Sequence, residues 1–218
     1  MEKTTRLTDG RPTGSEAYFY KDGLYLNVTN RCPTTCAFCV KREWKWRYRG
    51  WDLRLRREPS VAQLCRSAEQ MTMGVAVREI VFCGYGEPTY RLDAIAAVGQ
   101  VIAQIQPGVS RRLNTVGLGS AIWSCDIVPL LKRHLDVVSI SLNAACAEHW
   151  RLVHRPRPRY HQDGFNAVLD FIARCSKSRL RTIVTAVEKV TDDMEATERL
   201  ARSLGAEFRP RPYLPEES

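Results

Sequence analysis

Residues 30–42 read NRCPTTCAFCVKR and place three cysteines in one short loop, at the spacing Cys32-x3-Cys36-x2-Cys39. A β-rich segment that ends near Thr29 precedes the loop, so the cysteines follow the carboxyl end of a predicted strand. Thiolates this close together select soft or borderline metals. Zinc and iron–sulfur clusters are therefore the candidate ligands of this loop.

The number and distribution of the cysteines bear on that choice. Structural zinc takes four ligands, usually as two spaced pairs, but the other five cysteines are scattered singly: Cys65, Cys83, Cys125, Cys146 and Cys175. A cubane iron–sulfur cluster takes one cysteine per iron, so three in one loop would leave the fourth iron open to a substrate or cofactor. An open iron indicates chemistry rather than scaffolding. The spacing alone leaves zinc, or no metal, as the alternative.

Outward from this loop, apolar periodicity predicts alternating strands and helices. Two β-rich runs around Asp22-Gly23 predict a hairpin over 17–29, and the later strands are expected at 78–84, 111–117, 136–144, 181–188 and 207–215. Helices are expected at 60–74, with Ser60 as the N-cap, and at 92–105, 126–135, 163–177 and 192–205. The chain thus alternates six strands with five helices.

Such alternation with short connectors predicts right-handed βαβ units and a parallel sheet. The apolar run Val137 to Ile140 fits a strand covered on both faces. The sheet could be open and doubly wound or curved into a partial barrel, and periodicity does not separate the two. In either case, binding residues are expected at the carboxyl ends of the strands, where the three cysteines lie.

A second motif, VFCGYGEPTYR over 81–91, follows the next strand. Gly84 and Gly86 allow the backbone to approach a ligand closely, Glu87 adds a carboxylate, and Pro88 restricts the exit. Taken alone, the turn could be a tight strand–helix connection. Polar residues also end two later strands: Asn114, Thr115, Ser139, Ser141 and Asn143. Hydroxyls and amides there suit ribose or amino-acid groups, although they also end strands without any function.

Length and composition limit the class of protein. The 218 residues fit one domain, expected over 17–214, with residues 1–16 as an N-terminal tail expected to be mobile. The first residues are polar and charged, without the apolar core of a signal peptide, and no run of about 18 apolar residues follows. We expect a cytoplasmic protein whose cysteines are thiols or metal thiolates rather than disulfides.

The net charge of +9 is concentrated in two blocks, residues 41–58 and 151–161. Such blocks suit an anionic partner, although a solvated basic surface has the same composition. The expected substrate-binding residues are Arg47, Arg49, Arg155, Arg209, Arg211 and Tyr213. A different class of function remains open: a zinc-dependent nucleic-acid-binding module that stacks Trp44, Trp46, Tyr48 and Trp51 on bases.

Together, the C-x3-C-x-Phe38-Cys39 loop after a first strand and the G-x-G-E-P turn after a second resemble the radical S-adenosylmethionine (SAM) superfamily. More narrowly, the chain is similar to the TatD-linked radical SAM proteins through LYLNVTNRC, FCGYGEPTYRLD, RLNT, VSISLNA and FRPRPY. The resemblance runs from about Tyr20 to Tyr213. It implies a partial (β/α)6 TIM-like barrel, a [4Fe–4S] cluster and SAM as co-substrate.

The resemblance also implies roles for residues. Cys32, Cys36 and Cys39 would ligate the cluster, and Phe38 would lie beside the adenine. The turn Gly84-Tyr85-Gly86-Glu87 would receive the amino group of the SAM methionine. Ser141 and Asn143 would face the ribose or the methionyl carboxylate, with Thr115 nearby. The family often has Asn-Thr-Asn-Gly where this chain has Asn114-Thr115-Val116-Gly117, so one expected amide is missing.

The implied chemistry is reductive cleavage of SAM to methionine and a 5′-deoxyadenosyl radical, which abstracts hydrogen from a substrate. The expected partners are an electron donor such as flavodoxin or ferredoxin and an anionic small-molecule, nucleotide or peptide substrate. Alternatives within the enzyme class are activation of a protein partner as a glycyl radical and formation of a deazapurine. No catalytic residue is assigned. The histidines, His134, His149, His154 and His161, lack the pair spacing of a metal site and are expected at the surface or in support of the site.

Overall fold

The computed structural model describes residues 14–213. Its main sheet has seven strands in the order β1-β2-β5-β6-β7-β8-β9. Their bounds are β1 Ala17–Tyr20, β2 Gly23–Asn27, β5 Glu79–Cys83, β6 Ser110–Thr115, β7 Val137–Ser141, β8 Arg181–Val187 and β9 Glu207–Arg211. Residues 1–13 of the expected tail and residues 214–215 of the last expected segment lie outside the described range.

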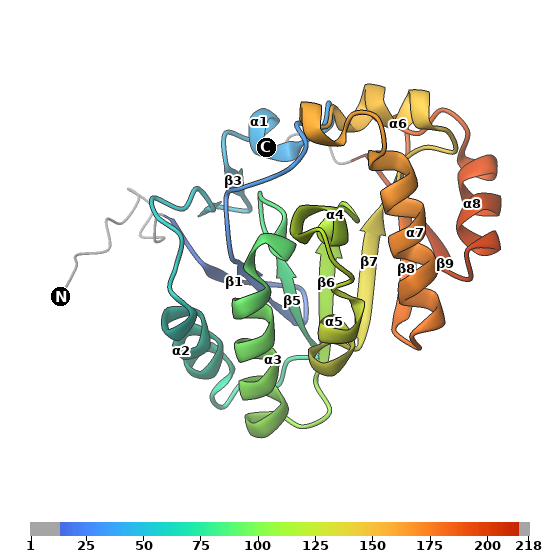
Figure 1. Ribbon diagram of the computed structural model, residues 1–218. Coiled ribbons are helices and arrows are strands. Elements are labelled where there is room, and N and C mark those ends of the chain that lie inside the picture. Colours follow the sequence, from blue (N-terminus) through green and yellow to red (C-terminus); the bar gives the residue numbers. More distant parts are fainter. Residues whose placement is uncertain (1–13, 214–218) are drawn as a thin grey trace.

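The strand order confirms a partial barrel. Strands β2 and β5 to β9 pair in parallel and follow one another in chain order, whereas a doubly wound sheet reverses its order at a switch point. Within this sheet, as described over residues 14–213, β1 alone is antiparallel, paired with β2 in the predicted N-terminal hairpin. The curved sheet thus brings the carboxyl ends of six parallel strands to one rim (Figure 1).

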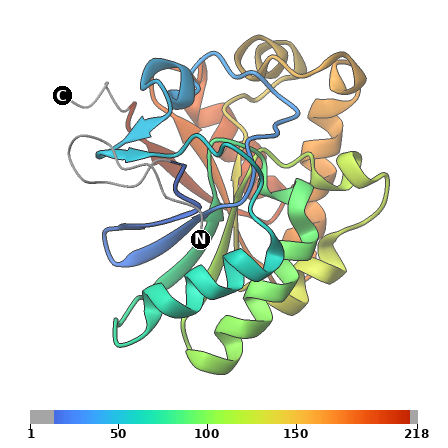
Figure 2. The ribbon, with the colours of Figure 1, turned by 90° about the vertical axis from the view of Figure 1, so that its left-hand side faces the viewer.

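The five predicted helices are present: α2 Val61–Thr72, α3 Leu92–Ile105, α5 Val128–His134, α7 Gly164–Lys177 and α8 Met194–Ser203. Ser60 caps α2 as expected, because its hydroxyl accepts from Gln63 N while the Gln63 side chain accepts from Ser60 N. Several short elements were not predicted: α1 Val40–Glu43, β3 Arg47–Tyr48, β4 Trp51–Asp52, α4 Gly119–Trp123, α6 Ala147–His154 and two 3-10 turns at Pro88–Arg91 and Pro158–Tyr160. The main helices lie along the outer side of the curved sheet (Figure 2).

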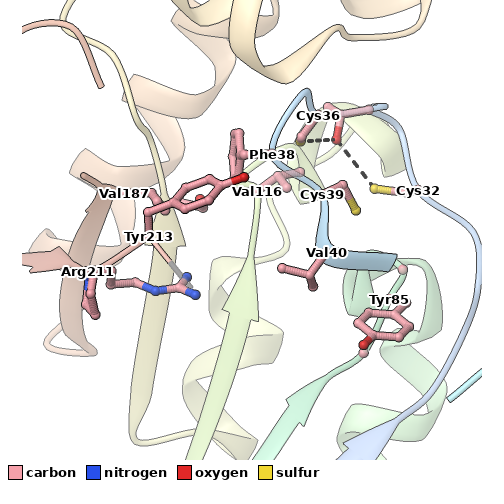
Figure 3. Close-up of a pocket in the computed structure, with 15 residues that line it drawn as sticks. Cys32, Cys36, Phe38, Cys39, Val40, Tyr85, Val116, Val187, Arg211 and Tyr213 are labelled. Carbon is pink, nitrogen blue, oxygen red and sulfur yellow. Dashed lines mark hydrogen bonds between the residues drawn. The ribbon is translucent and has the colours of Figure 1, made fainter. Parts of the chain in front are cut away.

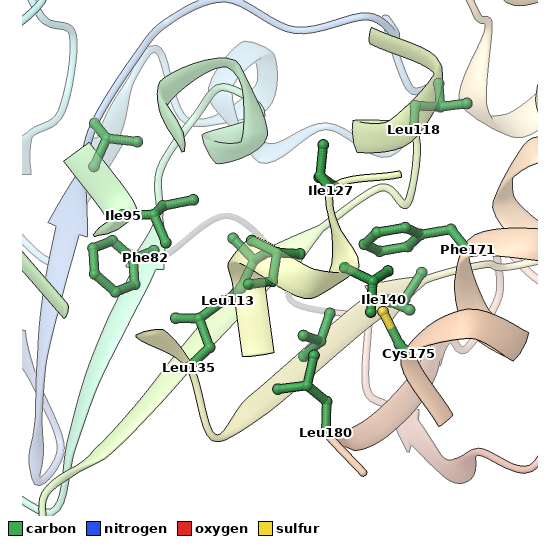
Figure 4. Close-up of a cluster of buried hydrophobic side chains, with 14 of the residues drawn as sticks. Phe82, Ile95, Leu113, Leu118, Ile127, Leu135, Ile140, Phe171, Cys175 and Leu180 are labelled. Carbon is green, nitrogen blue, oxygen red and sulfur yellow. The ribbon is translucent and has the colours of Figure 1, made fainter. Parts of the chain in front are cut away.

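The hydrophobic core lies between the outer face of the sheet and these helices (Figure 4). On β7, Val138 and Ile140 are fully buried in this core, while Ser139 and Ser141 line a cavity on the inner face. Successive side chains of a strand point to opposite faces. Val137 and Ser139, on the inner face, are buried as well, so the strand is covered on both faces from Val137 to Ile140, as expected. Helices cover its outer face, and its inner face lies against the interior of the barrel beside the cavity.

The segment after the cysteine loop packs against the start of the barrel. It forms the hairpin β3–β4, and a second apolar cluster gathers Tyr18, Leu53 and Tyr85 with partly buried aromatic residues around them. Trp44 is buried and stacks on Tyr48, with ring centroids 5.4 Å apart. The rings of Trp44 and Tyr48 thus pack on each other within the fold, which argues against their use as a base-stacking surface.

Two further findings concern the ends and the cysteines. Ser15 is buried and its N–H donates to Asp52 O at 2.9 Å, so the chain is already packed at this position of the expected tail. All eight cysteines are free thiols. Between residues 14 and 213, no helix has the length and apolar character that crossing a membrane requires.

Candidate functional site: the cysteine loop and the barrel cavity

The cysteine loop is held by the backbone at the end of α6 and just after it. Ala37 N donates to Val153 O at 2.8 Å, Thr35 N donates to Arg155 O at 3.0 Å, and Arg157 N donates to Pro33 O at 2.9 Å. These contacts join residues more than a hundred positions apart in the chain. The loop is therefore positioned by tertiary structure, in addition to the stiffness of Pro33.

Within the loop, the three cysteines line one pocket (Figure 3). The Thr34 hydroxyl lies between two of them, 3.4 Å from Cys32 Sγ and 3.3 Å from Cys36 Sγ. Burial raises the pKa of the Cys32 thiol and raises that of Cys36 to about 12. Thiolates at this position therefore need a cationic partner, which a metal centre supplies.

His154 supports the loop from behind. It is fully buried, with Nδ1 3.5 Å from Cys36 Sγ and Nε2 2.9 Å from Leu142 O. Its ring stacks on Trp150, and Phe38 meets it edge-on with centroids 5.6 Å apart. Of the two predicted places for the histidines, His154 takes the supporting one. The spacing of Trp150, Val153 and His154, which share the buried face of α6, was the sequence signal for it.

The glycine turn after β5 lies directly against the start of the cysteine loop. A Cβ at Gly86 would lie 2.2 Å from Thr29 O, and one at Gly84, where φ is +130°, would lie 2.2 Å from Asn27 Oδ1. Glu87 N donates to Arg31 O at 2.7 Å. Only glycine fits both positions, so the two motifs noticed in the sequence are packed together as one unit.

The carboxylate of Glu87 is fully engaged by the protein. It accepts from Thr89 N and Thr89 Oγ1 at 3.1 and 2.7 Å, from Thr115 Oγ1 at 2.7 Å and from Val116 N at 2.8 Å. Burial raises the pKa of Glu87, while these donors lower it. Glu87 and Thr115 thus tie the turn to the end of β6. Their side chains border the predicted SAM site, and the Glu87 carboxylate takes its hydrogen bonds from the protein itself.

The pocket beside the cysteines has a volume of about 190 Å³ and gathers most of the predicted cofactor residues. Cys32, Cys36, Cys39, Phe38, Gly84, Tyr85, Gly86 and Ser141 all line it, together with Val116, Val187, Arg211 and Tyr213. Asn143 does not reach the pocket. It is fully buried, its Nδ2 donates to Ser141 Oγ at 2.7 Å, and its Oδ1 accepts from Val187 N at 2.8 Å. The expected contact of Asn143 with SAM is therefore replaced by support of Ser141.

A larger cavity of about 590 Å³ adjoins this pocket, and Ser141, Arg211 and the glycine turn line both. Its wall includes Trp44 and Tyr48, which the sequence suggested only as base-stacking residues, and three aromatic residues that the sequence did not single out for binding: Tyr18, Tyr20 and Tyr25. Glu79 and Arg112 also face this cavity and bind each other at 2.6 and 2.9 Å. Cys83, the cysteine nearest the glycine turn, lines it too and lies 3.8 Å from Tyr18 Oη.

The expected substrate residues separate into two groups. Arg209 and Arg211 line the larger cavity, and Arg211 and Tyr213 line the smaller pocket. Arg47, Arg49 and Arg155 are exposed and line neither. The Arg49 guanidinium lies over the rings of Tyr20 and Tyr48, at 5.4 and 5.9 Å from their centroids. Of the arginines expected to bind substrate, the structure thus places only those of β9 at the cavities.

The fold and this site define a radical SAM protein. The model of the family described as "Radical SAM superfamily" matches residues 26–201, and the chain belongs to this family. The family uses a [4Fe–4S] cluster with SAM, and the chain is a radical SAM enzyme. This assignment decides against the zinc-dependent nucleic-acid-binding alternative.

Solved structures with the same fold are distant in sequence. A radical SAM methyltransferase from Sphaerobacter thermophilus is 17% identical, with a TM-score of 0.54 over 95% of this chain and 75% of the other. Methylornithine synthase (PylB) is 13% identical, with a TM-score of 0.60 over 89% and 54%. Streptococcus suis SuiB bound to S-adenosylmethionine is 14% identical, with a TM-score of 0.63 over 89% and 40%. The chain therefore spans about half of PylB and less of SuiB. No curated protein matches the chain.

The residues present fit the family's cofactors. Three thiols line one pocket, with Cys36 buried and Cys32 and Cys39 partly exposed, and burial raises the pKa of Cys32 and of Cys36. Within residues 14–213, no three His, Cys, Asp or Glu side chains are gathered as one metal ion would require. A cluster has a different requirement, because each cysteine binds its own iron. Next to the thiols, a glycine turn, an aromatic ring and a strand-end hydroxyl line the same pocket.

Proposed function

We propose that this enzyme cleaves SAM reductively and uses the resulting radical to remove hydrogen from an anionic small molecule. When bound, the cluster supplies the electron that splits SAM into methionine and the 5′-deoxyadenosyl radical. The observation that carries the proposal is the shared pocket: Cys32, Cys36 and Cys39 line it together with Gly84 and Gly86. That pocket adjoins a cavity large enough for a substrate.

Each group in the pocket has a separate task. Cys32, Cys36 and Cys39 would hold three irons, leaving one open. The turn from Gly84 to Glu87 would receive the SAM amino group, as in the resemblance from the sequence. Phe38 would pack on the adenine, and Ser141, held by Asn143, would contact the ribose or the carboxylate. Apolar groups such as Val116 and Val187 would keep water from the reacting centre.

The cavity favours a small molecule over a protein partner. Its volume of about 590 Å³ lies within the range of small-molecule sites, roughly 300–1,000 Å³. This supports hydrogen abstraction from a bound metabolite over activation of a partner as a glycyl radical. We also propose membership of the TatD-linked group, cytoplasmic location and reduction by a carrier such as flavodoxin or ferredoxin. These three proposals rest on the sequence motifs quoted above.

The test is substrate-free cleavage of SAM. The protein is reconstituted anaerobically with iron and sulfide, reduced with dithionite and incubated with SAM, and the products are separated by chromatography with mass detection. We expect slow formation of 5′-deoxyadenosine in the parent and none in Cys36→Ala. Methylthioadenosine as the sole product, or no cleavage by a protein that holds a full cluster, would refute the proposal.

A further inference from the structure

The edge strand β9 directs two arginines into the barrel. Arg209 pairs in register with Thr185 of β8, and Arg211 with Val187. Side chains opposite each other on neighbouring strands share a face of the sheet. Thr185 and Arg209 line the larger cavity, whereas Val187 and Arg211 line the smaller pocket. Figure 3 shows Arg211 extending from β9 toward the pocket.

These two guanidiniums differ from the other arginine of the cavity. Arg112 donates to both carboxylate oxygens of Glu79, to Asn114 Oδ1 at 2.7 Å and to Tyr25 Oη at 3.2 Å. Among residues 14–213, no hydrogen bond or ion pair engages the side chain of Arg209 or Arg211. The nearest acid in sequence, Glu207, binds Arg181 instead, at 2.9 Å through each oxygen.

The charges around the cavity leave this pair uncompensated. Its cations are Lys21, Arg112, Arg209 and Arg211, and its only carboxylates among the described residues are Glu79 and Glu87. Arg112 binds the first of these, and Thr89, Thr115 and Val116 bind the second. Arg209 and Arg211 are both exposed to solvent as well as lining the cavity. Two adjacent cations without a partner thus face a cavity, an arrangement that an anion would stabilise.

The aromatic wall of the cavity provides a complementary surface. Tyr20 and Tyr25 line it with ring centroids 5.5 Å apart, and Tyr48 lies 5.4 Å from Tyr20. Aromatic faces suit the flat or apolar part of an organic molecule. A guanidinium presents a planar fork that binds phosphate through two parallel hydrogen bonds, and two guanidiniums match the two charges of a phosphate monoester.

We propose that the cavity binds a phosphorylated small molecule, with its phosphate between Arg209 and Arg211 and its organic part against Tyr20 and Tyr25. The inference rests on the proposed function, since it names the substrate class of the same site. Arg211 borders both cavities, so a phosphate there would lie at the boundary between SAM and substrate. Arg209 borders the larger cavity alone. A substitution of Arg209 is therefore expected to weaken binding of the substrate without weakening binding of SAM.

The experiment measures binding of phenyl phosphate to the anaerobically reconstituted protein with SAM, by titration calorimetry at pH 8. We expect one site, lost at high salt, and at least tenfold weaker binding in Arg209→Gln and in Arg211→Gln. Benzoate, a monoanion with the same ring, should bind at least tenfold more weakly than phenyl phosphate. The affinity for SAM alone should be unchanged in Arg209→Gln. Arg199→Gln, on the exposed face of α8, is the matched control and should bind like the parent.

Several outcomes would overturn the inference. These are absence of phenyl phosphate binding in the parent, equal binding by Arg209→Gln and the parent, and equal affinity for benzoate. Loss of SAM affinity in Arg211→Gln with phenyl phosphate binding retained would assign Arg211 to the SAM carboxylate. Should Arg209→Gln fail to fold, Arg209→Lys keeps the charge without the fork and should still bind more weakly. Formation of 5′-deoxyadenosine without substrate tests the proposed function separately, because it does not require this phosphate.

Discussion

Glu87 and Arg211 both face the interior of the barrel, but their surroundings are opposite. The Glu87 carboxylate is fully buried and accepts four hydrogen bonds from Thr89, Thr115 and Val116. The Arg211 guanidinium faces the cavities, and no partner for it is found among the described residues. A charged group with every bond made by the protein maintains the shape of the site. One without such bonds is available to a ligand.

The largest effect is expected at the cysteine loop, which packs against the Glu87 turn and which we propose binds the cluster. Ala at Cys32, Cys36 or Cys39 should reduce iron and sulfide from about four each per chain to near zero, because each thiolate holds one iron. Iron and sulfide analysis after anaerobic reconstitution measures this. Cys125→Ser and Cys146→Ser, at exposed cysteines, are the controls and should keep a full cluster. The reverse pattern would assign the cluster to other thiols.

A smaller effect is expected at Glu87. Glu87→Ala leaves the donors of Thr89, Thr115 and Val116 buried without an acceptor, so the free energy of unfolding should fall by about 2–4 kcal/mol. Urea denaturation monitored by circular dichroism measures the change. Glu195→Ala, which removes an exposed carboxylate on α8, should stay within about 0.5 kcal/mol of the parent. Equal stability of Glu87→Ala and Glu195→Ala would remove the distinction between the two regions.

The smallest change is expected at Arg211. Arg211→Met keeps the length of the side chain and removes an unpaired cation from the cavity, so the free energy of unfolding should be unchanged or rise by up to about 1 kcal/mol. The same denaturation experiment measures it. A loss of more than about 1 kcal/mol would mean that Arg211 has a structural partner, and the comparison with Glu87 would then fail.

The positions of the strands and main helices followed from local patterns. Apolar residues recur at intervals of two or of three to four, and Ser60 marks the start of α2, because these signals depend on neighbours in the chain. The helices α4 and α6, of five and eight residues, were not predicted, whereas α5, of seven residues, was. The Cys32–Cys39 loop and the Gly84–Glu87 turn were found by their spacing.

The roles of individual polar residues were harder to predict. Ser141 and Asn143 are two positions apart on one segment, yet Ser141 lines the pocket and Asn143 is buried behind it. Asn143 has φ +56°, which turns its side chain out of the alternation that a strand would maintain. A local departure of this kind is invisible to periodicity.

By itself, the sequence determined the βα alternation, the cysteine loop and the glycine turn, because each depends on residue types at short spacing. Only the tertiary structure brought His154 against Cys36 and placed the donors of Thr115 and Val116 around Glu87. It also placed Arg209 and Arg211 at the cavities and left Arg47, Arg49 and Arg155 away from them. The physical reason is that burial and pairing of a polar group depend on which distant strand or helix packs beside it. Arginines that look alike in the sequence therefore differ in role, because the folded sheet places some at a cavity and others away from it.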